Sequence, residues 1–231
     1  MRVVDLFSGC GGLSQGFKTA DYNIVAAFDA WDEAIDTYKQ NFSHHAEVRD
    51  LTDTEQSIDI VAGWTPDIII GGPPCQDFSH AGPRTEGDRA NLTLAFAKIV
   101  CKVKPAWFVM ENVDRAQKSN TYQEARKIFK SCGYGLTEVV LDASFYGVPQ
   151  KRKRFFSIAG LYEDDEVLKP FLDALKAENP MTVRDYLGNT LGVDHYYRHP
   201  CNYKRRAVFS IDEPAPTVRG VNSPVAPGYP G

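Results

Sequence analysis

The chain has 231 residues, of which 43% are hydrophobic and 24% charged, which is typical of a globular domain with a sizeable core. The formal net charge of −4 does not exclude nucleic-acid binding, because the distribution of charge matters more than its sum. Neither a membrane-spanning run nor a signal-peptide pattern is present, and the scattered cysteines suggest neither disulfides nor a metal site, so we expect a reducing, cytoplasmic location.

The first predicted elements are typical of a nucleotide-binding unit. Residues 2–7 predict a strand, residues 8–12 a glycine-rich turn, and residues 13–20 a helix. Glycines let the backbone approach a ligand closely. Ser14 stands where the strict dinucleotide fingerprint requires glycine, which weakens an NAD-binding interpretation and leaves a purely structural turn open.

Two carboxyl groups follow at the ends of later predicted strands. The strand over residues 24–28 ends at Asp29, about twenty residues past the glycines, where a carboxylate can accept hydrogen bonds from ribose hydroxyls. Asp50 follows a short strand over residues 46–48. Either carboxylate could instead cap a neighbouring helix, such as the one predicted over residues 32–41.

A cysteine loop follows the apolar run of residues 68–70, which predicts a buried parallel strand. Gly71-Gly72-Pro73-Pro74 stops regular structure and places Cys75 beyond the carboxyl end of that strand, where open α/β sheets bind ligands. A thiol there is a candidate nucleophile, although most free cysteines are small buried hydrophobes. Residues 80–89 predict a mobile loop that could act as a lid, and residues 91–103 predict a helix.

The next strand brings a further acid to the same edge of the sheet. Residues 107–110 predict a buried strand that closes with Glu111-Asn112-Val113. A helix over residues 121–132 and two antiparallel strands over residues 136–141 and 155–159 follow. The basic run of residues 151–154 is either a solvated face or a contact to phosphates or bases.

Regular periodicity fades in the last part of the chain. Residues 170–177 predict a short helix, and from residue 189 onward prolines, glycines and aromatic residues dominate. Basic and aromatic side chains interleave near Arg206, which suits nucleic acid but also resembles an aromatic protein interface.

Taken together, the motifs resemble the signature of the DNA cytosine-5 methyltransferases. They are the segments 5–12, 72–76, 111–113 and 150–154, which stand in the family's order over roughly the first 160 residues. The resemblance implies an α/β fold: a doubly wound, mostly parallel sheet of the S-adenosylmethionine-dependent methyltransferase type, with an antiparallel hairpin at one edge. It also implies a catalytic domain over residues 1–162, a connection over 163–185, and a small irregular target-recognition region over 186–231.

The resemblance implies S-adenosylmethionine as the cofactor. Phe7 would pack on its adenine, the glycine turn would approach its methionine part, and Asp29 would hold the ribose hydroxyls, where relatives usually have glutamate. Asp50 would contact the adenine amino group. The residues expected at the cofactor are Phe7, Ser8, Gly9, Gly11, Gly12, Asp29, Asp50, Pro73 and Leu92.

The resemblance also assigns the chemistry and the substrate, double-stranded DNA. The Cys75 thiolate would add to carbon 6 of a flipped-out cytosine, Glu111 would act at ring nitrogen 3, and Arg154 would hold the ring carbonyl. The catalytic residues expected are Cys75, Glu111, Arg152 and Arg154. The residues expected at the DNA are Pro74, Gln76, Ser79, Asn112, Lys151, Arg206 and Thr217.

Other interpretations remain open on the sequence alone. The family's closing motifs are not found after residue 218, so we expect a chain that is incomplete or completed by a second polypeptide, and that alone binds cofactor poorly and is hard to keep soluble. A tRNA cytosine-5 methyltransferase would share the scaffold, although Phe78-Ser79 and Glu111–Val113 look like the DNA branch. A non-catalytic subunit and an NAD-dependent oxidoreductase are the remaining alternatives.

Overall fold

The computed structural model describes residues 1–74, 86–198 and 206–217, without the side chains of residues 86–91. The chain divides into two compact units. The first comprises Met1–Val140 and Arg154–Phe171, and the second comprises Leu141–Lys153 and Leu172–Gly231.

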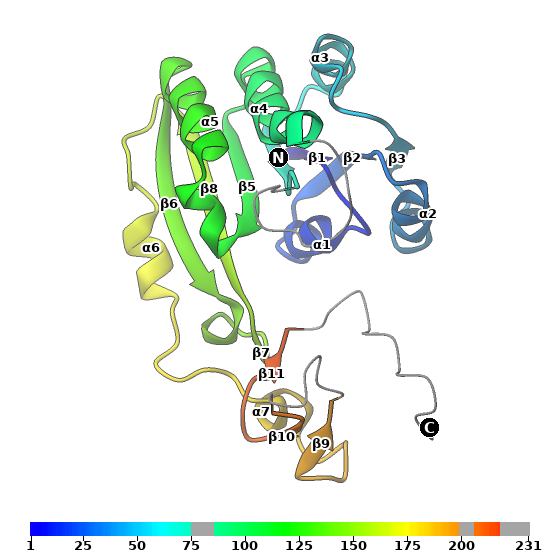
Figure 1. The fold of residues 1–231 in the computed structure, drawn as a ribbon, viewed down its shortest axis with the longest axis vertical. Helices are drawn as coiled ribbons and strands as arrows, with labels where there is room; N and C mark the ends of the chain where they lie inside the picture. Colours follow the sequence, from blue (N-terminus) through cyan, green and yellow to red (C-terminus); the bar gives the residue numbers. More distant parts are fainter. Residues whose placement is uncertain (75–85, 199–205, 218–231) are drawn as a thin grey trace. The chain divides into compact units, whose positions relative to one another are not determined.

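The first unit is built on a seven-stranded sheet with the order β3-β2-β1-β4-β5-β8-β6 (Figure 1). The strands β3, β2, β1, β4 and β5 are parallel, and β8 runs antiparallel to β5. The chain order reverses between β1 and β4, so the loops after these strands meet at the point where open α/β sheets bind ligands. The strands are β1 Arg2–Leu6, β2 Asn23–Asp29, β3 His45–Val48, β4 Ile68–Gly71, β5 Trp107–Val113, β6 Tyr134–Asp142 and β8 Lys153–Leu161.

Helices cover both faces of this sheet. Helices α3, α4 and α5 pack against the face that carries Val4 and Leu6, and α1 packs against the face that carries Val3. None of the helices in the described ranges is long and apolar enough to cross a membrane. The helices of this unit are α1 Gly12–Thr19, α2 Asp32–Asn41, α3 Thr54–Gly63, α4 Glu86–Val103, the 3-10 helix η1 Asp114–Lys118 and α5 Asn120–Ser131.

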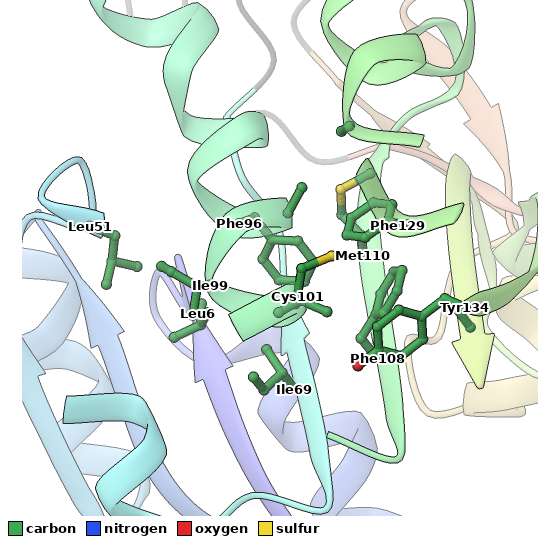
Figure 2. Packing of buried hydrophobic residues seen from close by; sticks show 14 of the residues in the cluster. Leu6, Leu51, Ile69, Phe96, Ile99, Cys101, Phe108, Met110, Phe129 and Tyr134 are labelled. Carbon is green, nitrogen blue, oxygen red and sulfur yellow. The ribbon is translucent and has the colours of Figure 1, made fainter. Parts of the chain in front are cut away.

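Aromatic rings fill the core between α4, α5 and the sheet (Figure 2). The Phe108 and Phe129 rings lie 4.3 Å apart, and Tyr134 packs edge-on against Phe108 at 5.1 Å. Burial of one such side chain stabilises a fold by about 1.5–3 kcal/mol. This core fixes β5 against its neighbours, and β5 carries two of the predicted site residues at its carboxyl end.

The prediction of a doubly wound, mostly parallel sheet with an antiparallel hairpin at one edge is confirmed. Strand β8 runs antiparallel to β5, and its other neighbour in the sheet is the edge strand β6. One local prediction needs correction, and one helix has no counterpart among the predicted elements. The predicted loop over residues 80–89 is too long, because α4 already begins at Glu86, while residues 80–85 lie outside the described ranges. Helix α3 was not predicted, although Asp53 gives it an N-cap by accepting a hydrogen bond from the Gln56 backbone N–H at 3.2 Å.

The second unit is small and held by short strands and polar contacts. Strand β11 pairs in parallel with β7, and β10 pairs antiparallel with β9. The Arg184 guanidinium joins α7 to Asp194 at 2.7 Å and to Asp212 at 2.5 Å. The elements of this unit are η2 Ala143–Phe145, β7 Gln150–Lys151, α7 Val183–Leu187, β9 His195–Tyr197, β10 Val208–Ser210 and β11 Ala215–Pro216. Helix α6, Lys169–Ala174, begins in the first unit and ends in the second.

Candidate functional site

The carboxylate of Asp29 links the loops that follow β1 and β2. Its Oδ2 accepts a hydrogen bond from the Gly9 backbone N–H at 2.8 Å, and its Oδ1 accepts one from the Trp31 N–H at 2.9 Å. Helix α2 begins at Asp32 without a side-chain cap, so Asp29 does not serve as a helix cap. Two backbone donors therefore hold a carboxylate in place at the carboxyl edge of the sheet.

The turn between β1 and α1 has an unusual backbone. Phe7 has a φ of 57°, a left-handed conformation that costs energy in a residue other than glycine and is often found at functional sites. Gly11 has a φ of 94°, and a Cβ atom built on it would lie 2.4 Å from the Phe42 ring. At Gly9 and Gly12 the space that a Cβ would occupy is open, with no atom within 4 Å. The turn therefore presents bare backbone at the end of β1.

Trp31 is a site candidate outside the motifs that the sequence singles out. Its side chain is 63% exposed, which is unusual for so large a ring, and it follows the anchored Asp29 by two positions. An exposed ring beside a fixed carboxylate suits a ligand with both an aromatic base and hydroxyl groups. The sequence could have indicated this site, because Trp31 lies between the end of a predicted strand and the start of a predicted helix.

The other predicted cofactor residues occupy the same edge of the first unit. Asp50 follows β3, is exposed, and accepts a hydrogen bond from the Thr52 backbone N–H at 2.9 Å. Leu92 is half-buried on α4. Ser8 is buried, and its Oγ has no hydrogen-bond partner within the described ranges.

Asp5 lies fully buried on β1 beneath the turn. Burial raises the pKa of its carboxyl to about 7, the hydrogen bond from Ser14 opposes that rise, and the nearby charge of Asp29 adds to it. Ser14 Oγ donates to Asp5 Oδ2 at 2.6 Å, while Asp5 Oδ1 has no partner in the described part of the chain. A carboxyl group that titrates near neutrality is typical of functional sites.

The two strands that flank β4, β1 and β5, both fix the start of the loop that follows it. A Cβ on Gly71 would lie 2.4 Å from the Leu6 carbonyl oxygen, so only glycine fits between β1 and β4. The Asn112 side-chain amide on β5 donates to the Pro73 carbonyl oxygen at 2.9 Å. Pro73 is buried and Pro74 is exposed. The predicted residues Cys75, Gln76 and Ser79 lie outside the described ranges, directly after this loop.

An acid and a base meet beside this loop. Arg154 Nε lies 2.9 Å from Glu111 Oε1, and the two side chains are only 23% and 25% exposed. Because β8 runs antiparallel to β5, its first residues lie at the edge where β5 ends. A Cβ on Gly72 would lie 3.6 Å from Glu111 Oε2, which places this ion pair next to the loop that leads to Cys75.

The remaining predicted residues belong to the second unit. The Thr217 hydroxyl donates to the Lys151 carbonyl oxygen at 2.8 Å, and the Arg152 carbonyl accepts from the Ala143 N–H at 3.0 Å. Arg206 is engaged within the unit: it pairs with Glu213 at 2.8 Å and lies 4.8 Å over the Phe209 ring. Within the described ranges, no group of three or more His, Cys, Asp or Glu side chains could hold a metal ion.

Comparisons with known proteins identify the family of the chain. The family model described as C-5 cytosine-specific DNA methylase matches residues 1–213. The chain is 53% identical over 230 residues to the type II methyltransferase M.HindV of Haemophilus influenzae, covering 99% of this chain and 76% of that protein. It is 51% identical over 230 residues to the type II methyltransferase M.HgiDI of Herpetosiphon aurantiacus, covering 99% of this chain and 74% of that protein.

Solved structures share the fold. A putative DNA modification methyltransferase encoded within an Escherichia coli prophage is 31% identical, with a TM-score of 0.64, and the match covers 81% of this chain and 54% of that one. The Dnmt2 methyltransferase of S. pombe is 26% identical, with a TM-score of 0.66, and the match covers 80% of this chain and 59% of that one.

Proposed function

The chain belongs to the C-5 cytosine-specific DNA methylases, and from this membership we propose that it methylates carbon 5 of cytosine in a specific sequence of duplex DNA. The observation that carries the proposal is the loop Gly72–Pro74. Asn112 holds it at the end of β4, the Glu111–Arg154 ion pair lies beside it, and Cys75 follows it directly.

Residues of the first unit fit S-adenosylmethionine as the cofactor. Asp29 offers a fixed carboxylate for ribose hydroxyls, Trp31 an exposed ring for adenine, and the Gly9–Gly12 turn an open backbone for the methionine part. Asp50, Phe7 and Leu92 complete the proposed set. When bound, this cofactor supplies a methyl group activated by a positively charged sulfur.

Cys75 is the proposed nucleophile. Carbon 5 of cytosine is a poor nucleophile, and addition of the thiolate to carbon 6 makes it reactive by a covalent route. Once carbon 5 has taken the methyl group, loss of its proton expels the Cys75 thiolate and restores the aromatic ring. The target base must leave the stack for the thiolate to reach it.

Glu111 and Arg154 are proposed to stabilise the charge that develops on the ring. Glu111 would act at ring nitrogen 3 and Arg154 at the ring carbonyl oxygen. Their ion pair keeps both side chains in place at 2.9 Å before the base enters. Each group can therefore meet the base without a large movement of the backbone.

The second unit is proposed to contribute to DNA recognition. Thr217 follows β11 and donates a hydrogen bond to Lys151 on β7, and Arg206 is paired with Glu213 near β10. We propose residues 1–162 as the catalytic domain, 163–185 as a connection and 186–231 as the recognition region. Residues 141–153 of the second unit, Lys151 among them, thus belong to the proposed catalytic domain and also contribute to DNA binding. Action on genomic DNA implies a location in the bacterial, archaeal or phage-infected cytoplasm.

The test is a genome-wide map of 5-methylcytosine in a methylation-free host that expresses this chain. Methylation in one short motif is expected for the parent, and none for Cys75→Ser or Glu111→Gln. An unmethylated genome in the host that expresses the parent would show that this chain alone does not methylate DNA. Repeating the map with neighbouring reading frames co-expressed would then test the predicted need for a second polypeptide. Methylation of tRNA but not of DNA would favour the tRNA alternative over the DNA branch that the family match supports.

A further inference from the structure

A line of hydrogen-bonded side chains runs from the buried end of β1 to the protein surface. Ser14 Oγ donates to Asp5 Oδ2 at 2.6 Å, and the Tyr38 hydroxyl donates to Ser14 Oγ at 2.7 Å. The same Tyr38 oxygen lies 2.7 Å from His44 Nε2. Asp5, Ser14 and Tyr38 are buried, whereas His44 is half-buried. The line thus connects a buried carboxyl group with a ring that reaches solvent.

The charge of Asp5 decides the direction in which these hydrogen bonds are donated, because each hydroxyl carries only one proton. When Asp5 is ionised, Ser14 donates to it, Tyr38 donates to Ser14, and His44 donates through an Nε2–H. When Asp5 is protonated, its own O–H can donate to Ser14, and each later bond reverses. His44 Nε2 then accepts, and the neutral ring carries its proton on Nδ1.

We propose that Ser14, Tyr38 and His44 form a proton relay that lets the buried Asp5 change its charge as cofactor is exchanged for product. The proposal rests on the proposed function. In the relay, Asp5 gives its proton to Ser14, Ser14 gives its own to Tyr38, and Tyr38 gives its own to His44 Nε2. The Nδ1 proton of His44 passes to water, so one proton leaves and an Asp5 carboxylate remains.

The surroundings place this relay next to the proposed cofactor turn. Asp5 precedes the turn, Ser14 follows it, and the Tyr38 ring would lie 2.9 Å from a Cβ on Gly11. The charge of Asp29, whose carboxylate is bonded to the turn at Gly9, acts on Asp5. Methyl transfer removes the positive charge from the cofactor's sulfur. The positive charge of the bound cofactor therefore favours the ionised form of Asp5, and the uncharged product favours its protonated form.

Charged groups around His44 suit its role at the outer end. Burial lowers the pKa of His44, and the neighbouring charges of Lys18 and His45 lower it further. The ring is therefore neutral near pH 7 and free to accept or donate at Nε2. Asp5, whose pKa is about 7, titrates in the same range.

Calorimetry of ligand binding in two buffers with different ionisation enthalpies, between about pH 6 and pH 8, tests the proton exchange. Binding of S-adenosylmethionine to the 231-residue chain should release more protons than binding of S-adenosylhomocysteine. Asp5→Asn should abolish the difference, and Tyr22→Phe should retain it. Ser14→Ala should move the release to higher pH, because the carboxylate loses its donor. Binding heats that do not depend on buffer would overturn the relay but not the proposed cofactor. No binding of either ligand would fit the poor cofactor binding expected of the chain alone, and the ligand-free measurement below would then decide the relay.

A second measurement needs no ligand. Nitrogen-15 NMR of the free protein should show the neutral His44 ring changing from the Nδ1–H to the Nε2–H form as pH rises through the ionisation of Asp5. Tyr38→Phe keeps the ring that packs on Gly11 but removes the hydroxyl, and should abolish that change. The same His44 tautomers in the parent and in Tyr38→Phe would refute the relay.

Discussion

Replacement of Asp5 by asparagine should change how the stability of the first unit depends on pH. The side chain is fully buried, and burial raises the pKa of its carboxyl from 3.8 to about 7. Between these values the folded protein keeps a proton that the unfolded chain releases. Rising pH therefore favours unfolding, and stability that is present below about pH 4 is lost as pH approaches 7.

The size of this loss follows from the shift. A difference of roughly three pKa units corresponds to about 4 kcal/mol. Asparagine cannot ionise, and its carbonyl oxygen can still accept the hydrogen bond from Ser14. The unfolding free energy of the parent should thus fall by about 4 kcal/mol relative to Asp5→Asn between about pH 4 and pH 8.

Urea unfolding followed by tryptophan fluorescence provides the assay. Trp31, Trp64 and Trp107 all lie in the first unit, so the signal reports on the sheet that contains Asp5. Asp59→Asn, at an exposed position on α3, is the matched control and should follow the parent at every pH. Parallel curves for the parent and Asp5→Asn would refute the assignment of Asp5 as a buried, titrating group.

Three further predictions follow from individual contacts. Gly71→Ala should destabilise the chain by about 3 kcal/mol or more, because its Cβ would meet the Leu6 carbonyl oxygen at 2.4 Å. Gly16→Ala, where the space for a Cβ is open, should be neutral or stabilising by about 0.5–1 kcal/mol, and equal melting temperatures of the two variants would contradict the predicted clash at Gly71. Tyr134→Phe should cost about 1 kcal/mol in urea unfolding, because the buried hydroxyl donates to the Pro105 carbonyl at 2.8 Å, and a loss no larger than that of Tyr22→Phe would argue against it. Arg184→Met should speed hydrogen exchange in β10 by removing the ion pairs to Asp194 and Asp212, and unchanged protection would show that these pairs do not hold the second unit.

Much of the first unit follows from the sequence alone. The strands and most helices have clear periodicity, and the glycine-rich turn and the Pro-Pro loop mark their ends. In a parallel α/β sheet, such loops share one edge by topology, so the placement of Asp29 and Glu111 at strand ends was predictable. Helix α3 escaped prediction because its apolar face is short.

Only the tertiary structure decided which side chains meet. Glu111 and Arg154 lie far apart in sequence, and the antiparallel placement of β8 beside β5 brings them to 2.9 Å. Likewise, nothing local in the sequence links Asp5 with Tyr38, because their contact through Ser14 depends on how α1 and α2 pack around the turn. Local sequence thus determined the elements and the motifs. The burial of each side chain and its hydrogen-bond or ion-pair partners, which set its pKa and reactivity, depended on contacts between segments distant in sequence.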